Sequence, residues 1–138
     1  MVEIDIEYEG ALHTRAVHGP SGAVVTTDAP KDNMGLGEAF SPSDLLATSL
    51  GACMLTIMGI VAQREAIELK GSRVKVQKEM TATPPRRVAK LTVIFDLTAE
   101  VSDVQKQKLE NAAHTCPVHR SLHPEIVVET IFRWPARV

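Results

Sequence analysis

Apolar and polar residues alternate along six segments of the chain. At the start, Val2, Ile4 and Ile6 are separated by acidic residues, a period-two pattern that is typical of a half-buried strand. Glycine and proline residues between the segments predict turns, including one at residues 83–86. The six expected strands cover residues 2–8, 11–18, 23–27, 70–80, 91–97 and 126–132.

A long apolar helix is expected after the third strand. Ser41 and Asp44 fit a capping box, and Pro42 occupies the first helical position, where proline is favoured. The helix is expected to continue to about Glu68. It is apolar on nearly every side as far as Gln63, which predicts a central element buried all round.

A second helix is expected to begin at another capping box, formed by Ser102 and Gln105 with Val101 before it. Pro117 ends or kinks this helix, and a short helix to Leu122 is expected to follow. Its apolar face would contain Val104, Leu109, Ala112, Ala113 and Cys116. The order β-β-β-α-β-β-α-β predicts a single α+β domain over residues 1–138, with mostly antiparallel sheets.

Composition narrows the classes of function. The chain has 138 residues, of which 44% are hydrophobic and 23% charged, as is ordinary for a soluble protein. A net charge of −2 and an aromatic content of 4% argue against a nucleic-acid partner. Residues 45–62 carry no charge, but their polar and glycine residues favour a helix buried in a globular core or at a subunit interface over a membrane span. Without a signal-peptide pattern, a cytoplasmic protein with reduced thiols and no membrane partner is expected.

The two cysteines are the main candidates for chemistry. Cys53 lies in the middle of the first helix and Cys116 at the end of the second. Both could instead be structural thiols, since free cysteine packs as a small apolar side chain. The helix dipole acts only near the first turn, so the Cys53 thiolate would need a cation such as Arg15 or His13. Backbone N–H groups at the start of the short helix would lower the pKa of Cys116, and this local argument favours Cys116 as the nucleophile.

Other polar residues give weaker signals. His114, His119 and His123 lie around Cys116 in the sequence, and histidine is a common zinc ligand. Their spacing matches no zinc motif, however, and no metal or cofactor is expected. Asp44 is explained by its capping role. Glu38 lies in a long polar loop, residues 28–40, and is expected to be a solvated charge.

Two segments of the chain resemble the OsmC/Ohr family of osmotically inducible proteins and organic hydroperoxide reductases. The first reads Ser41-Pro-Ser-Asp-Leu-Leu-Ala-Thr-Ser-Leu-Gly-Ala-Cys53, and the second reads Ala113-His-Thr-Cys116-Pro-Val-His-Arg-Ser-Leu122. The resemblance covers essentially the whole chain. It implies an OsmC-like fold with antiparallel sheets around two central helices, assembled as an intertwined homodimer.

The resemblance also implies a thiol peroxidase. Cys53 would attack an organic hydroperoxide and become a sulfenic acid, and Cys116 would resolve it as a disulfide that an external dithiol reduces. This assignment reverses the local argument about which sulfur attacks first. Arg15 is the residue that best matches the arginine that activates the thiol in the family.

The chain departs from the hydroperoxide reductases after the proline of the first motif, where they carry a glutamate. Ser43 stands at this position, and Asp44 follows one place later. An alternative interpretation is therefore an OsmC-like stress or small-ligand-binding protein without efficient peroxidase activity. The apolar helix around Cys53 suits an alkyl hydroperoxide better than hydrogen peroxide. Candidate substrate-binding residues are Met54, Ile57 and Met58, and candidate supporting residues are Asp44, Glu38 and His119.

Overall fold

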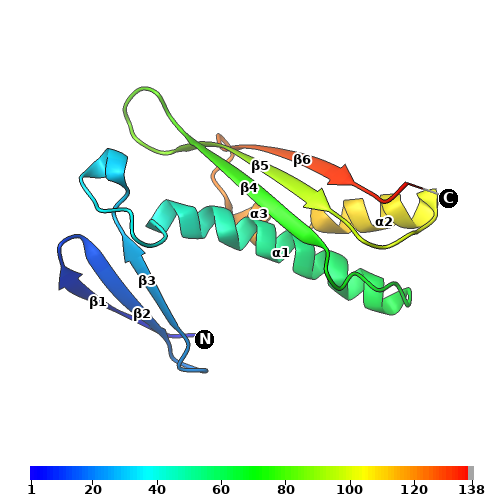
Figure 1. The fold of residues 1–138 in the computed structure, drawn as a ribbon, viewed down its shortest axis with the longest axis horizontal. Helices are drawn as coiled ribbons and strands as arrows, with labels where there is room; N and C mark the ends of the chain where they lie inside the picture. The colour runs from blue at the N-terminus through cyan, green and yellow to red at the C-terminus, as the bar shows by residue number, and fades with distance from the viewer. Residues whose placement is uncertain (137–138) are drawn as a thin grey trace. The chain divides into compact units, whose positions relative to one another are not determined.

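The chain is seen in a computed structural model that describes residues 1–136. It forms two compact units, Met1–Leu46 and Ala47–Val138. The elements follow the expected α+β order, with the short helix before the last strand and a 3₁₀ helix that the sequence did not indicate. Figure 1 shows this order along the chain.

The first unit contains an antiparallel sheet in the strand order β1-β2-β3. β1 covers Ile4–Gly10, β2 covers His13–His18 and β3 covers Val24–Asp28, and the 3₁₀ helix η1 covers Lys31–Asn33. The expectation that the first strand is half-buried is wrong for the single chain, because Ile6 and Tyr8 are 67% and 64% exposed. The alternation correctly indicates an apolar face, but it does not say whether the same chain covers that face.

The second unit contains a sheet in the order β4-β5-β6. β4 covers Arg73–Met80, β5 covers Val88–Asp96 and β6 covers Val127–Arg133. β4 and β5 are antiparallel, as expected, whereas β5 and β6 are parallel. The expectation of mostly antiparallel pairing is confirmed, and this last pair is the exception, because the connection through two helices returns the chain to the same end of the sheet.

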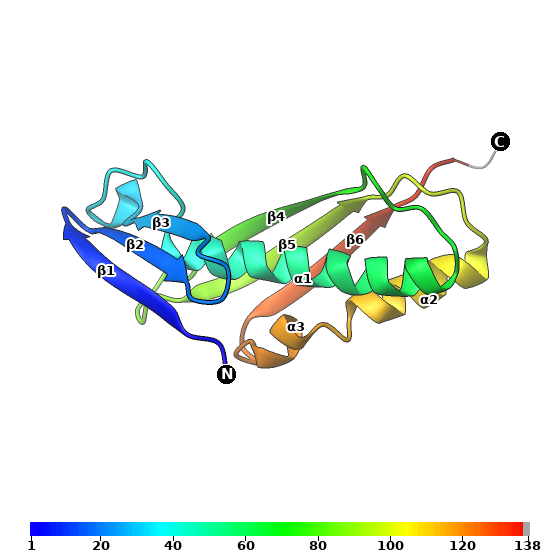
Figure 2. The ribbon, with the colours of Figure 1, turned by 90° about the horizontal axis from the view of Figure 1, so that it is seen from below.

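Three helices complete the described chain: α1 (Pro42–Arg64), α2 (Asp103–Ala113) and α3 (Pro117–Ser121). Within the second unit, α1 and α2 lie on one face of the sheet β4-β5-β6 (Figures 1 and 2). A Cβ atom on Gly51 of α1 would lie 2.7 Å from a methyl carbon of Val76 on β4. Glycine therefore lets this helix approach the sheet more closely than any other residue would.

The ends of α1 follow from local hydrogen bonds. Asp44 N–H donates to Ser41 Oγ over 3.1 Å, and the Asp44 carboxylate accepts from Ser41 N–H over 2.9 Å. At the other end, Ile67 N–H donates to the Ala62 carbonyl while Ala66 adopts a left-handed φ of 54°. This Schellman arrangement ends the helix at Arg64, before the expected Glu68.

One stripe of α1 is buried, rather than the whole circumference. The buried residues recur every three or four positions, as one face of a helix requires, and the opposite face is exposed. The single chain therefore does not bury this helix all round, and burial of its exposed face at a subunit interface stays a prediction. The helix also has the length and hydropathy of a membrane span, a property that core helices of soluble proteins share. The buried residues are Ala47, Leu50, Gly51, Met54, Met58 and Ala62.

The core of the second unit lies between the helices and the sheet. The rings of Phe95 and Phe132 stack with their centroids 4.6 Å apart. On α2 the capping box of Ser102 is present, and Leu109 is fully buried. Val104, however, is 79% exposed. Val104 precedes Leu109 by five residues, which corresponds to a rotation of about 140° around the helix axis. The predicted apolar face of this helix was therefore too wide.

Candidate active site

Two reduced cysteines from different segments meet in the second unit. Cys53 lies on α1, about three turns from its start, and Cys116 immediately precedes α3. The two thiols lie close enough for Cys53 to raise the pKa of the Cys116 thiol. Cys116 has no exposed surface, whereas Cys53 is half-buried. The structure therefore brings together two sulfur atoms whose proximity the sequence left open.

Cys116 is held in place by the helix that it begins. It occupies the N-cap position of α3, with Pro117 at the first helical position. Its sulfur accepts a hydrogen bond from the backbone N–H of His119 over 3.3 Å. Its carbonyl accepts one from Arg120 N–H over 3.1 Å. These contacts hold the Cys116 side chain at the start of α3.

Burial controls the protonation of Cys116. Removal of the sulfur from water raises the pKa of the Cys116 thiol, and the nearby Cys53 raises it further. The N–H groups of His119 and Val118 act in the opposite direction, but they do not outweigh the burial. The expected lowering of the Cys116 pKa is therefore wrong, because burial outweighs the N–H groups at the start of the short helix.

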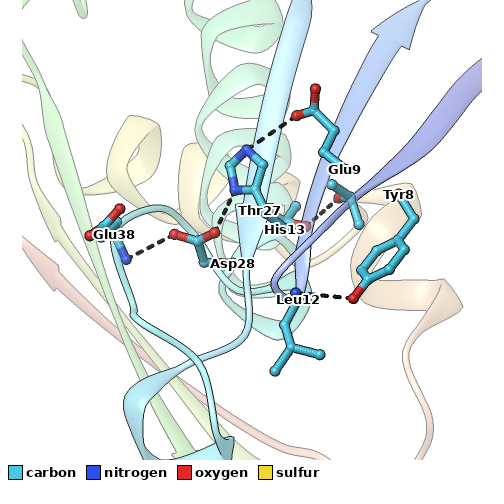
Figure 3. A network of polar contacts seen from close by, with 8 residues as sticks. Tyr8, Glu9, Leu12, His13, Thr27, Asp28 and Glu38 are labelled. Carbon is cyan, nitrogen blue, oxygen red and sulfur yellow. Dashed lines mark hydrogen bonds and ion pairs between the residues drawn. The ribbon is translucent and has the colours of Figure 1, made fainter.

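The first unit contains a polar network that the sequence did not reveal (Figure 3). His13 Nδ1 lies 2.5 Å from a carboxylate oxygen of Asp28, and His13 Nε2 lies 3.4 Å from Glu9 Oε1. The other Asp28 oxygen accepts the backbone N–H of Glu38 over 3.0 Å. Beside this network the hydroxyls of Thr14 and Thr27 are hydrogen-bonded to each other.

Comparisons with known proteins establish the family. A sequence profile named OsmC-like protein matches residues 35–131, which is more than half of the chain. The chain belongs to the OsmC family. No curated protein sequence matches the chain significantly.

Solved structures of OsmC-family proteins resemble this chain over nearly its whole length. A protein of Psychrobacter arcticus, named as a candidate osmotic stress induced and detoxification response protein, is 44% identical with a TM-score of 0.90, and the match covers 96% of both chains. An OsmC-like protein of Mycoplasma pneumoniae is 16% identical with a TM-score of 0.80 and the same coverage. An organic hydroperoxide resistance protein OsmC of Legionella pneumophila is 19% identical with a TM-score of 0.72, again covering 96% of each chain.

The predicted substrate-binding residues of this OsmC-family chain differ in burial. Met54 and Met58 have no exposed surface and pack in the core of the second unit. Ile57 is half-buried. A role for the two methionines in binding substrate stays a prediction that would require them to become accessible, whereas Ile57 already has exposed surface.

The predicted supporting residues have structural contacts of their own. Asp44 accepts the backbone N–H of Ser41 at the start of α1. His119 donates its N–H to Cys116, and its ring lies 6.3 Å from that of His114. Within residues 1–136, no three side chains of histidine, cysteine, aspartate or glutamate gather as a metal ion would require, so the histidines around Cys116 do not converge.

Arg15 and Glu38 belong to the first unit. Arg15 is exposed on β2, opposite Glu7 on one side and Thr26 on the other. Its role as the activating cation stays a prediction. Glu38 contributes its backbone N–H, and not its carboxylate, to the hydrogen bond with Asp28. The pairing of His13 with Asp28 depends on strand register, and alternation in the sequence does not define register.

Proposed function

We propose that this OsmC-family protein is a thiol-dependent peroxidase that reduces organic hydroperoxides to alcohols. The observation that carries the proposal is the proximity of a half-buried thiol, Cys53, to a fully buried one, Cys116. A sulfenic acid formed on Cys53 would have a resolving thiol beside it. The name of the Legionella pneumophila structure, an organic hydroperoxide resistance protein, is consistent with this chemistry.

The proposed reaction has three balanced steps. The Cys53 thiolate attacks the terminal peroxide oxygen, the O–O bond breaks, and the alkoxide leaves with a proton as the alcohol. The Cys116 thiol then attacks the sulfenic sulfur, a disulfide forms, and the hydroxyl leaves with the thiol proton as water. An external dithiol reduces the disulfide by thiol–disulfide exchange and is itself oxidised to a disulfide. A protonated Cys116 fits the second step, because it supplies the proton of the departing water.

Further parts of the proposal concern the surroundings of the thiols. Arg15 is the proposed cation that favours the Cys53 thiolate, and the apolar side chain of Ile57 is a proposed contact of the alkyl group. We also propose a cytoplasmic location, where reduced thiols are maintained. A homodimer would cover the exposed apolar residues of β1.

The test compares two cysteine variants with the wild type in the consumption of cumene hydroperoxide with dithiothreitol as the reductant. We expect Cys53→Ser to lose activity. Cys116→Ser, treated with peroxide without reductant, should accumulate a sulfenic acid that dimedone labels. Ala52→Ser is the matched control, because it adds a hydroxyl to an exposed position of the same helix. The proposal fails if Cys53→Ser consumes peroxide as fast as the wild type.

A second function is favoured by Ser43. This serine stands where the hydroperoxide reductases of the family carry a glutamate, and its hydroxyl lies 3.2 Å from that of Ser41. A serine is uncharged and cannot orient an arginine as a glutamate does. An OsmC-like stress or small-ligand-binding protein would keep both thiols reduced after treatment with peroxide, and this outcome distinguishes it from the peroxidase.

A further inference from the structure

The network around His13 lies outside the proposed peroxidase chemistry. We propose that His13, while positively charged, is a pH-dependent clasp that holds residues 29–40, here called the Asp28 loop, closed against the β1-β2-β3 sheet. Loss of the His13 proton would loosen this loop. The inference rests on the geometry of the first unit and is independent of the proposed function.

The Asp28 loop is compact and returns to its own starting point. Asp28 N–H donates to the Phe40 carbonyl over 3.0 Å, and Gly37 N–H donates to the Ala29 carbonyl over 3.2 Å. A Cβ atom on Gly35 would lie 1.7 Å from the Ala29 carbonyl oxygen, so only glycine permits this close return. Closely spaced ends are typical of an Ω-loop, a class of surface loop that often carries function.

Asp28 connects His13 to the loop. Its residue surface is only 6% exposed, so its carboxylate needs partners inside the protein. One carboxylate oxygen faces His13 Nδ1, and the other accepts the N–H of Glu38 in the loop. A change in charge at His13 therefore acts directly on the acceptor that holds the loop.

The positions of the two ring nitrogens favour the charged form of His13. Nδ1 faces the Asp28 carboxylate and Nε2 faces that of Glu9, so both nitrogens point at acceptors (Figure 3). Only the imidazolium has a proton on each nitrogen, whereas the neutral ring has one donor and one acceptor. Neutral His13 would therefore leave a lone pair opposed to a carboxylate.

The charges around His13 come from each neighbouring element of the first unit. Glu9 lies on β1, Asp28 at the end of β3 and Glu38 in the loop. The hydrogen bond to Asp28 raises the pKa of His13 above its ordinary value, partial burial lowers it, and the charges of all three carboxylates raise it. The other charged or titratable residues on these elements are Asp5, Glu7 and Tyr8 on β1, Arg15 and His18 on β2, and Lys31 and Asp32 in the loop.

The direction of the pH effect follows from this raised pKa. Below about pH 6.5, the ordinary histidine pKa, His13 is charged whether the clasp is closed or open, and the stabilisation is fully present. As the pH rises through the raised pKa of the closed state, His13 loses its proton and the stabilisation is lost. The loop is therefore held at pH values below the raised pKa of His13 and released above it.

The test measures amide hydrogen exchange at Glu38 by NMR between pH 5 and pH 9, corrected for the intrinsic exchange rate, together with the titration of the His13 ring. We expect the protection of Glu38 to decrease by roughly tenfold as His13 titrates, which is the effect of weakening one charge-assisted hydrogen bond. His13→Gln should give lower protection that does not depend on pH. His18→Gln should keep the wild-type profile, because this half-buried histidine contacts Ser21 instead.

Two results would overturn the clasp. One is a wild-type Glu38 protection that stays constant while His13 titrates, which needs no variant and so holds even if His13→Gln does not fold. The other is the same pH profile in folded His13→Gln as in the wild type. Neither result bears on the peroxidase, because no thiol takes part in the measurement.

Discussion

Cys116 illustrates how two opposing effects act on one sulfur atom. The N–H group of His119 favours the thiolate, as expected at the start of a helix. Complete burial favours the neutral thiol, and together with the nearby Cys53 it determines the direction of the pKa shift. A protonated, buried thiol is poorly suited to attack a peroxide, but it is well suited to resolve a sulfenic acid.

The difference in exposure between Cys53 and Cys116 predicts the order in which the two thiols are alkylated. With limiting iodoacetamide at pH 7.5, Cys53 should be modified well before Cys116, because alkylation requires an accessible thiolate. Peptide mass spectrometry of the digested protein measures the two rates. In Cys53→Ser, Cys116 should stay unlabelled until the protein is denatured. Equal labelling of both cysteines in the native wild type would contradict the description of Cys116 as buried and protonated.

Single residues could be predicted from the sequence where local chemistry determines their role. The capping pairs of Ser41 with Asp44 and of Ser102 with Gln105 are confirmed. The position of Cys116 at the start of a short helix is confirmed as well. The predicted direction of the Cys116 pKa shift was wrong, because the degree of burial depends on tertiary packing, which no motif encodes.

At the scale of elements, α1 owes its position on the sheet to Gly51. A Cβ atom there would lie 2.7 Å from a Val76 methyl carbon and 3.6 Å from both methyl carbons of Val74. The contact lies one turn or less from Cys53, so the packing of the helix on β4 also positions the thiol.

Two glycines of α1 provide a matched pair of substitutions. Gly51→Ala should lower the free energy of unfolding by about 1–2 kcal/mol, because overpacking outweighs the gain in helix propensity. Gly59→Ala has no neighbouring atom within 4 Å of the new Cβ and should raise it by up to about 1 kcal/mol. Urea denaturation measures both. A Gly51→Ala protein as stable as Gly59→Ala would show that the close approach is absent.

The positions of helices and strands were predicted more accurately than the pairing and burial of their faces. The six strands and the two longer helices are confirmed, with ends shifted by a few residues. The parallel pairing of β5 with β6 and the exposure of Val104 were not foreseen. Periodicity indicates that a face is apolar, but the partner of that face depends on contacts between segments far apart in the sequence.

At the scale of the whole molecule, apolar side chains of β1 are exposed in the single chain. Ile4, Ile6 and Tyr8 on β1 are each more than half exposed. The charges are also unevenly distributed. The unit Met1–Leu46 contains eight acidic and two basic residues, whereas Ala47–Val138 contains nine acidic and thirteen basic ones. Contiguous apolar surface and opposite net charges on the two units are properties that favour self-association.

A homodimer is therefore predicted in solution. Light scattering coupled to size exclusion should give twice the chain mass of 15.0 kDa. Ile6→Lys should shift the protein toward the monomer, because a charge would be placed in the apolar contact. Val104→Lys changes an equally apolar and exposed residue on α2 and should leave the mass unchanged. A wild-type mass of 15.0 kDa would contradict the prediction.

The central claim is that Cys53 and Cys116 form a peroxide-reactive pair. Its most direct test is titration of free thiols before and after one equivalent of an alkyl hydroperoxide, without reductant. The proposed chemistry predicts the loss of two thiols per chain, their recovery with dithiothreitol, and a disulfide-linked peptide containing both cysteines. Two thiols that remain free after exposure to peroxide would contradict the claim and favour a binding role for the same fold.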